Sequence, residues 1–586
     1  MTPAFERGVA GRRCLAPVWL VAALILVSHT ASGCTRKDES APAGHPEPEK
    51  QQLGERLYRE GILASGQPIR AVVAGDIRVE GAMFACANCH LRSGLGTTEG
   101  PIITPRINAA TLFAPLPRGV PWSGPSFSTA EKPVWETPPP WFDAGFLRDA
   151  YTQEELATVI RTGTNAVGQS LDDAMPRFDL GDQDMAALLD YLGQLSAKYS
   201  PGVSETTLSF ATVVTDEVPP ADRELMLRVL QGYIDTRNAK PRHEKKRARA
   251  GPFYRREGDT AYRDIELVTW ELSGPPETWR NQLERHYREH PVFALLGGIS
   301  TGPWSPVHAF CEEHRIPSLF PITDQPVVSK TDWYTLYLSK GLHQEGEGAA
   351  RWLRRVETVD ADARIVQLYR AGGREEVVAH AFEATWTEVG RSAPRNEILP
   401  TGEKEASAFL DALLKDQTPQ VLLLWLGADA APLLKDLARR PDRPGTVVVA
   451  AGLLGEDLSA VPEAARAFTY VTYPYSLPGT KQRAEIAVKR WLDARKIPVT
   501  NLRLQANIYF LGWMLSGALR GMRNEFYREY FMETMDMMTD QDWAVVGYPR
   551  LSFGPGQRYA AKGCYVVQLG PGPTPELRQV SDWVVP

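Results

Sequence analysis

From residue 205 to its end, the chain alternates between short apolar runs and longer segments with apolar residues at helical spacing. The runs have strand length and are rich in aliphatic and β-branched residues. The predicted strands cover residues 208–214, 265–271, 292–296, 317–320, 364–369, 421–425 and 446–450. The predicted helices cover residues 222–237, 276–290, 304–314, 375–389, 405–415 and 430–439. This alternation predicts an α/β fold whose parallel sheets have helices on both faces.

The start of the chain has the pattern of an export signal. Three arginines come first, at Arg7, Arg12 and Arg13. The apolar stretch at 15–27 has the length of a signal-peptide core and is too short to span a membrane well. It leads to Ala-Ser-Gly-Cys34, which resembles a bacterial lipobox. We expect a signal peptide at 1–33, a lipid on Cys34 and a polar tether at 34–50. Cleavage without lipidation is the alternative, because lipoboxes prefer Leu where Ala31 stands.

A Cys-x-x-Cys-His motif, formed by Cys86, Cys89 and His90, is the strongest chemical signal in the chain. Two thiols one helical turn apart reach the two vinyl groups on one porphyrin edge, and the adjacent imidazole binds the iron. A zinc site needs a second cysteine pair, but the other four cysteines are isolated. A thioredoxin-like pair follows a βαβ pattern, which residues 81–85 do not provide. The motif predicts one covalent haem c, with His90 as an axial ligand of the iron.

Met175 is the predicted second axial ligand. A thioether suits haem iron, Pro176 stiffens the backbone after it, and Gly181 or Asp182 then caps a helix. The alternative for a methionine in such a place is core packing. Met83 is too close to Cys86 in the sequence to reach the opposite face of the haem easily.

Residues 51–200 resemble a class I cytochrome c domain. The similar segments are a first helix at 54–61, the haem motif, a third helix opening at 151, and the Met-Pro segment with the last helix. The resemblance implies an all-α domain whose first and last helices cross. The crossing residues would be Gly54, Tyr58, Leu188 and Tyr191. It also implies electron transfer to a redox partner protein, either a dehydrogenase or another cytochrome.

An insertion at about 101–142 departs from that family. Its proline- and tryptophan-rich composition is not helical. It is either a loop wrapped over the haem edge or a docking surface for the redox partner.

Residues 205–586 resemble type I periplasmic binding proteins of the branched-chain amino acid receptor kind. The similar segments are 292–302, 315–323, 551–558 and 564–569. The resemblance implies two Rossmann-like lobes that close on a ligand. The first lobe would cover about 205–335, with a return near 475–545.

Ser300 and Thr301 lie between a predicted strand and a predicted helix, where free backbone N–H groups and the helix dipole favour a carboxylate. The alternative is that Ser300 only caps its helix. In the family, Thr323 is the second contact point, and Trp304 would form an apolar wall. The family usually has Tyr-Gly after the first strand of the second lobe, whereas Arg370 stands here. Either the ligand differs from an amino acid, or the lobes serve as a scaffold.

Charge and the remaining motifs add limits. A net charge of −6 gives no argument for nucleic-acid binding, and the basic run at 240–249 predicts a solvated loop, with anionic lipid contact as the alternative. His308 and His314 lack the spacing of metal ligands on a helix, and no hydrolase elbow or phosphate loop occurs, so we expect no catalytic residues. Cys311 and Cys564 form either a disulfide or two buried thiols.

Three functions remain open. The first is a membrane-tethered electron carrier of the periplasm or outer cell surface, whose C-terminal domain binds a small solute or docks a redox partner. The second is a receptor of an ABC transport or sensing system for an amino-acid-like or small carboxylate ligand, with the haem as accessory or redox sensor. The third is a haem peroxidase, which needs an open iron site and which Met175 argues against.

Overall fold

The computed structural model describes residues 47–99, 102–117, 147–248, 263–360, 362–399, 403–416, 418–455, 458–538, 545–553, 556–572 and 575–585. Residues Lys50–Pro586 form one unit. The predicted signal peptide, Cys34, most of the tether and most of the insertion at 101–142 lie outside the described residues.

Helices dominate the N-terminal part of the chain, residues 47–200. They are α1 (Glu47–Glu60), η1 (Ala82–Phe84), α2 (Cys86–His90), α3 (Ala109–Leu112), α4 (Gln153–Thr162) and α5 (Asp182–Leu192). Helix α4 begins where the sequence predicted a third helix, at a capping box between Thr152 and Glu155, and it ends at the left-handed Gly163.

Short strands correct the expectation of an all-α domain. β1 (Arg70–Val73), β2 (Ile77–Glu80) and β7 (Arg177–Phe178) form a three-stranded antiparallel sheet. Two two-stranded ribbons add β3 (Thr98–Glu99), β4 (Ile102–Ile103), β5 (Leu116–Pro117) and β6 (Leu147–Arg148). The β1–β2 hairpin forms because β-branched residues flank a turn in which Ala74 and Gly75 both have positive φ.

The predicted crossing of the first and last helices is present. A Cβ atom at Gly54 would overlap with the carbonyl oxygen of Ala187, so only glycine lets α1 approach α5 this closely. The rings of Tyr58 and Tyr191 pack beside that point, with their centroids 5.3 Å apart. Leu188 is also buried in the same core.

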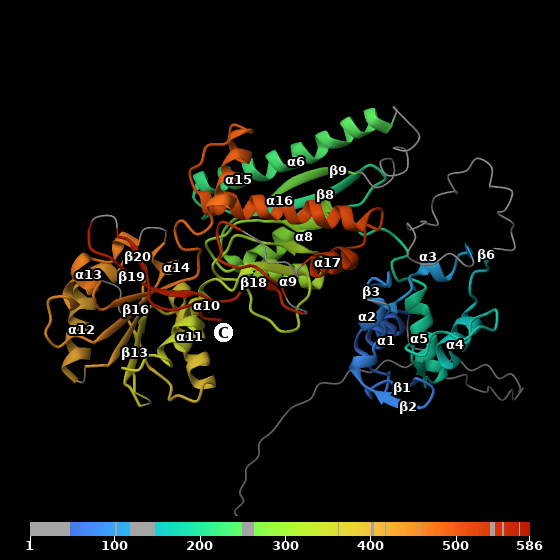
Figure 1. Cartoon of the computed structure of the whole chain (residues 1–586), viewed down its shortest axis with the longest axis horizontal. Helices are drawn as coiled ribbons and strands as arrows, with labels where there is room; N and C mark the ends of the chain where they lie inside the picture. The colour runs from blue at the N-terminus through green and yellow to red at the C-terminus, as the bar shows by residue number, and fades with distance from the viewer. Residues whose placement is uncertain are drawn as a thin grey trace, which may run out of the picture. The chain divides into compact units, whose positions relative to one another are not determined.

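A six-stranded sheet forms lobe 1 of the C-terminal part (Figure 1). Every neighbouring pair in it is parallel, in the order β18-β12-β11-β10-β8-β9. The strands are β8 (Thr207–Thr215), β9 (Asp264–Leu272), β10 (Ala294–Leu296), β11 (Ser318–Leu319), β12 (Thr335–Ser339) and β18 (Tyr559–Ala561). The helices are α6 (Pro220–Ala248), α8 (Trp279–Glu289), α9 (Ser305–Glu313), α15 (Gln482–Asp493), α16 (Leu502–Met522) and α17 (Arg528–Met537).

Helix α6 corrects one detail of the sequence analysis. The run at 240–249 was expected to be a loop, but α6 continues to Ala248. Lys, Arg, Glu and Ala, which make up most of this run, are strong helix formers.

A seven-stranded sheet forms lobe 2, in the order β14-β13-β15-β16-β17-β19-β20. Its strands are β13 (Ile365–Tyr369), β14 (Arg395–Ile398), β15 (Val421–Trp425), β16 (Thr446–Ala450), β17 (Thr469–Tyr473), β19 (Tyr565–Leu569) and β20 (Leu577–Gln579). Its helices are α10 (Leu342–Leu353), α11 (Arg374–Glu388), α12 (Glu403–Asp416), α13 (Ala430–Leu437) and α14 (Ala451–Leu454). The first five strands in this order are parallel to one another. β19 then pairs antiparallel with β17, and β20 pairs antiparallel with β19.

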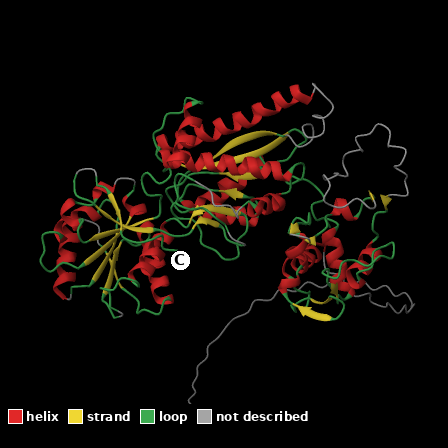
Figure 2. Cartoon of the chain, in the orientation of Figure 1, coloured by secondary structure: helices red, strands yellow, loops and turns green. Residues whose placement is uncertain are grey.

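The continuous apolar run of β15 is explained by burial on both faces. Val421, Leu423 and Trp425 pack in one core cluster with residues of α10 and α11. Leu422 and Leu424 pack in another with residues of α12 and α13. Figure 2 shows helices on both sides of this sheet, as the sequence predicted.

The chain passes between the lobes three times, from β12 to α10, from β17 to α15 and from β18 to β19. The predicted two-lobe arrangement with a return to lobe 1 is therefore correct. Lobe 1 also takes β12 and β18, which lie outside the predicted bounds. Within the described residues, no helix is long and apolar enough to cross a membrane.

Candidate functional site

The Cys-x-x-Cys-His motif forms a single helical turn, α2, and His90 at its end is buried. The His90 Nδ1 atom lies 2.9 Å from the carbonyl oxygen of Pro105. Because a carbonyl oxygen only accepts, Nδ1 carries the proton, and Nε2 keeps its lone pair in the neutral ring. Burial lowers the pKa of His90, which favours that neutral, metal-binding form.

Two of the other three predicted haem residues lie at the core of the N-terminal part. Cys86 and Met175 both pack against the apolar cluster between α1 and α5, while Cys89 is exposed. Burial raises the pKa of Cys86 to about 12. The backbone N–H of Met175 donates to the Asp172 carbonyl at 3.0 Å, which fixes the turn that carries the thioether. This donor set, with an orientated imidazole, two thiols and a thioether, fits a covalent haem c.

Ser300 does not offer a vacant carboxylate site. Its hydroxyl donates to Oε1 of Glu217 at 3.1 Å, and the backbone N–H of Gly302 donates to the same oxygen at 3.2 Å. A ligand carboxylate was predicted at this position, but the carboxylate found there is that of Glu217 in the chain itself. Capping is not the role of Ser300 either, because Trp304 is the N-cap residue of α9. Thr301 is exposed beside this contact.

Trp304, predicted as an apolar wall of the ligand site, is a core residue of lobe 1 and is not among the residues that line the pocket described below. It is fully buried in lobe 1, where its ring would collide with any Cβ atom at Gly298. Gly298 has a φ of 96°. The Gly297-Gly298 pair is the sequence signal for this close packing, because a residue with a Cβ atom at 298 would leave no room for the ring.

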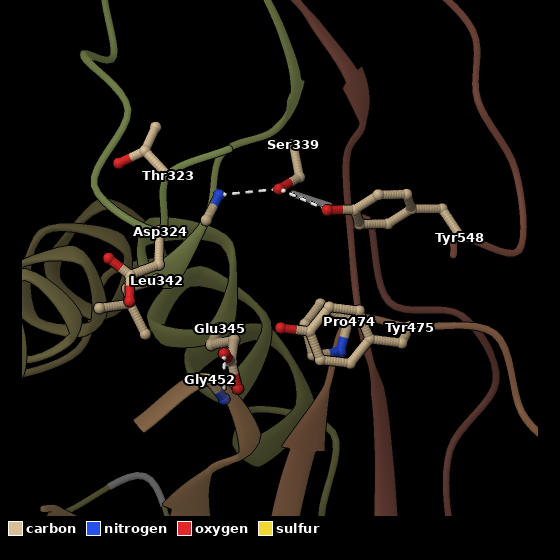
Figure 3. A pocket seen from close by; sticks show the side chains of 10 residues that line it. Thr323, Asp324, Ser339, Leu342, Glu345, Gly452, Pro474, Tyr475 and Tyr548 are labelled. Atoms are coloured by element: carbon tan, nitrogen blue, oxygen red, sulfur yellow. Dashed lines mark hydrogen bonds between the residues drawn. The ribbon is translucent and has the colours of Figure 1, made fainter. Parts of the chain in front are cut away.

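A pocket lies where the chain passes between the lobes (Figure 3). Predicted residue Thr323 lines it. So do residues from both lobes and their connections: Asp324, Ser339, Gly341, Leu342, Glu345, Gly452, Pro474, Tyr475 and Tyr548. The space is small, about 50 Å³. An apolar cavity that binds benzene has a volume of about 150 Å³, so this pocket is well below that size.

Glu345 is the most buried ionisable group of this pocket. Its two oxygens accept hydrogen bonds from the backbone N–H of Gly452 and from the Thr472 hydroxyl, each at 2.9 Å. Burial raises the pKa of Glu345 to about 8. In Figure 3 the hydroxyl of Tyr475 points toward this carboxyl group.

An ion pair joins the two lobes at the pocket. Asp324, after β11 of lobe 1, pairs with Arg374, the first residue of α11 in lobe 2. The Arg374 guanidinium also donates to the carbonyl of Gly452 at 2.9 Å. Burial raises the pKa of Asp324, and its Oδ1 atom is buried without a hydrogen-bond partner among the described residues. Glu345 and Asp324 were not predicted from the sequence, because neither acidic residue belongs to a recognisable motif.

Arg370 occupies the lobe 2 position that departs from the resembled family. Its guanidinium pairs with Asp429 at 2.7 Å, at the ends of β13 and β15. The cation is thus engaged within its own lobe.

Cys311 and Cys564 form no disulfide with each other. Cys311 is buried in the lobe 1 core on α9, and Cys564 is buried just before β19 of lobe 2. The two-thiol alternative is correct.

The family comparison covers most of both lobes. A family model described as periplasmic binding protein matches residues 253–572, more than half of the chain. Among curated proteins, no sequence matches this chain.

Similar solved structures include a putative branched-chain amino acid ABC transporter from Rhodospirillum rubrum, at 15% identity and TM-score 0.45, covering 65% of this chain and 100% of that one. A fatty acid ABC transporter substrate-binding protein from Thermomonospora curvata has 17% identity and TM-score 0.45, covering 66% and 95%. An ABC transporter substrate-binding protein from Sphaerobacter thermophilus has 13% identity and TM-score 0.48, covering 65% and 98%. By the family match across both lobes, the chain belongs to the periplasmic binding protein family.

Proposed function

We propose that the C-terminal part is the solute receptor of an exported transport or sensing system. The observation that carries this proposal is the pocket of Figure 3, which residues of both lobes line and beside which Asp324 and Arg374 join the lobes. Parting and closing of the lobes about their three connections would admit and retain the solute.

The lining favours a solute that donates hydrogen bonds. Asp324 supplies a carboxyl oxygen that has no hydrogen-bond partner among the described residues, and no Lys or Arg is among the described lining residues. Glu217 meanwhile fills the position at Ser300 where a carboxylate was expected. We therefore favour a small amine, amide or polyol, and we no longer favour a solute whose carboxylate binds at Ser300.

Calorimetric titration with panels of amines, polyols, amino acids and simple carboxylates tests this proposal. For a binding amine or polyol, Tyr548→Phe and Thr323→Val should each weaken the affinity about tenfold, the worth of one hydrogen bond. Thr331→Val, on an exposed loop, is the matched control. If only carboxylates bind, the proposed solute class is wrong.

The hydrogen bond between His90 and Pro105 favours electron transfer as a second candidate function. We propose that Cys86 and Cys89 hold one haem c, with His90 and Met175 as its axial ligands. The haem supplies one-electron redox chemistry when bound. The carbonyl of Pro105 fixes the tautomer and orientation of His90. A dehydrogenase or another cytochrome would be the redox partner.

A pyridine haemochrome spectrum tests the haem directly. The double variant Cys86→Ala/Cys89→Ala should lose covalent haem. Met175→Ala should lose the weak near-infrared sulfur–iron band, whereas Met83→Ala, at a side chain that is 78% exposed, should keep it. Retention of haem by the cysteine variant would rule out the assignment.

Membrane anchoring is a further part of the proposal. We propose that Cys34 carries a lipid that tethers the protein to a membrane. Cys34→Ser should then move the protein into the soluble fraction, and an unchanged membrane fraction would contradict the anchor.

A further inference from the structure

Three glutamates of lobe 1 contact the N-terminal part, and we call them the carboxylate row: Glu525, Glu529 and Glu533. Glu529 and Glu533 are one turn apart on α17, and Glu525 lies just before that helix. Their partners in the N-terminal part are Arg106, Arg59 and Ser93, respectively.

Two of these contacts lie at the backbone segments that hold His90. Ser93 comes three residues after His90, and its N–H and hydroxyl donate to the two oxygens of Glu533 at 2.9 and 2.6 Å. Arg106 directly follows Pro105, whose carbonyl accepts from the His90 ring, and it pairs with Glu525 at 2.5 Å.

The third contact reaches the helix behind this loop. Arg59 of α1 pairs with Glu529 at 2.6 Å. The neighbouring residue, Tyr58, donates to the carbonyl of Leu91, the residue after His90, at 2.7 Å. The carboxylate row thus contacts three segments: the loop after His90 at Ser93, which we call the His90 loop, the loop after Pro105 at Arg106, and α1 at Arg59.

Stacking adds to this attachment. The guanidinium of Arg92, between Leu91 and Ser93, lies 4.1 Å from the ring centroid of Trp333 in lobe 1. Arg558 of lobe 1 also lies 4.1 Å from that centroid. The Arg92 contact therefore holds the segment after His90 against lobe 1, whereas the Arg558 contact lies within lobe 1.

Glu533 contacts the N-terminal part through hydrogen bonds, and its own side chain is buried there. Its side chain is 4% exposed, and burial raises its pKa to about 8, so the group is largely neutral near pH 7. Ser93, which donates both hydrogen bonds to Glu533, is completely buried. Removing the side chain would free the His90 loop and give water access to it.

We propose that Glu533 is a positioning residue for the haem: through Ser93, lobe 1 fixes the loop that carries His90 and keeps water from it. This inference rests on the proposed haem. Water near the iron favours its more positively charged, oxidised form, so loosening this cover should lower the midpoint potential.

Redox titration of the full-length haem protein tests the inference. Glu533→Ala should lower the midpoint potential by about 59 mV, which is a tenfold shift in a one-electron equilibrium. Glu533→Gln should restore the wild-type potential, because an amide can still pair with both groups of Ser93. Glu313→Ala, an exposed carboxylate of α9 that pairs with Arg280, is the control and should change nothing.

Ser93→Ala and Arg106→Ala provide independent variants in case Glu533→Ala does not fold. Each should lower the potential in the same direction, since each breaks one contact between lobe 1 and the loops at His90. A haem protein whose potential is unchanged in all three variants would overturn the inference and leave the haem assignment intact. A wild-type protein without haem would overturn both.

Discussion

Glu345→Gln tests whether a buried carboxyl group at the pocket is protonated in the folded protein. The folded-state pKa is about 8, against an ordinary value of 4.5, because burial penalises the charged form. The folded state therefore keeps a proton that the unfolded state releases. The resulting stabilisation is complete below the unfolded pKa and is lost as pH rises from about 4.5 to about 8.

The size of the effect follows from the two pKa values. Between pH 5 and pH 7 this group should lower the free energy of unfolding by about 2 kcal/mol. A glutamine side chain is neutral throughout this range. Its oxygen can accept from Gly452, and its amide can face Thr472, whose hydroxyl also reaches the Val449 carbonyl at 3.3 Å. The variant should thus keep the contacts without the titration.

Urea unfolding at the two pH values measures the effect. The variant should be more stable than the wild type at both pH values, and the difference should be about 2 kcal/mol larger at pH 7 than at pH 5. Glu388→Gln, at a carboxylate that is 70% exposed, is the control and should show no such pH dependence. An equal difference between variant and wild type at both pH values would refute the reasoning.

Three further substitutions, one of them with a control variant, have defined outcomes. Glu217→Ala should open the donors at Ser300, so that formate raises the melting temperature of the variant but not of the wild type; equal shifts would contradict this. Arg374→Ala leaves Asp324 buried without its cation and should destabilise the protein by about 1–3 kcal/mol in urea unfolding. Arg351→Ala, whose ion pair with an exposed glutamate is longer at 3.6 Å, should cost less. Gly54→Ala should destabilise the N-terminal part by about 1–3 kcal/mol through overpacking of α1 on α5, and a wild-type thermal transition would exclude that crossing.

Local patterns predicted much of the fold. The strand at 421–425 was recognisable because burial on both faces requires a continuous apolar run. Gly54 was placed at the helix crossing by the resemblance to class I cytochrome c domains, and the close approach of α1 to α5 gives the physical reason. The β1–β2 hairpin was missed because its strands are four residues long, too short for an alternating pattern to stand out.

The site depends on pairs that no local pattern encodes. Glu217 and Ser300 are 83 positions apart, and Ser93 and Glu533 are 440 apart. The strand end and helix start around Ser300 suggested a ligand carboxylate, but the sequence does not show that Glu217 takes this position. Trp304 precedes α9, as the sequence predicted. Its ring nevertheless packs into the core of lobe 1, because Gly298 leaves space for it.

The short segment from β18 to β19 supplies a strand to each lobe, so both sheets depend on it for completion. Residues 559–561 complete the sheet of lobe 1, and residues 565–569 join the sheet of lobe 2. Until this stretch has been synthesised, β12 and β17 are exposed edge strands at the same time. Neither lobe is encoded by one continuous segment, so no single truncation yields an intact lobe. A premature stop before residue 559 would leave both sheets open to aggregation.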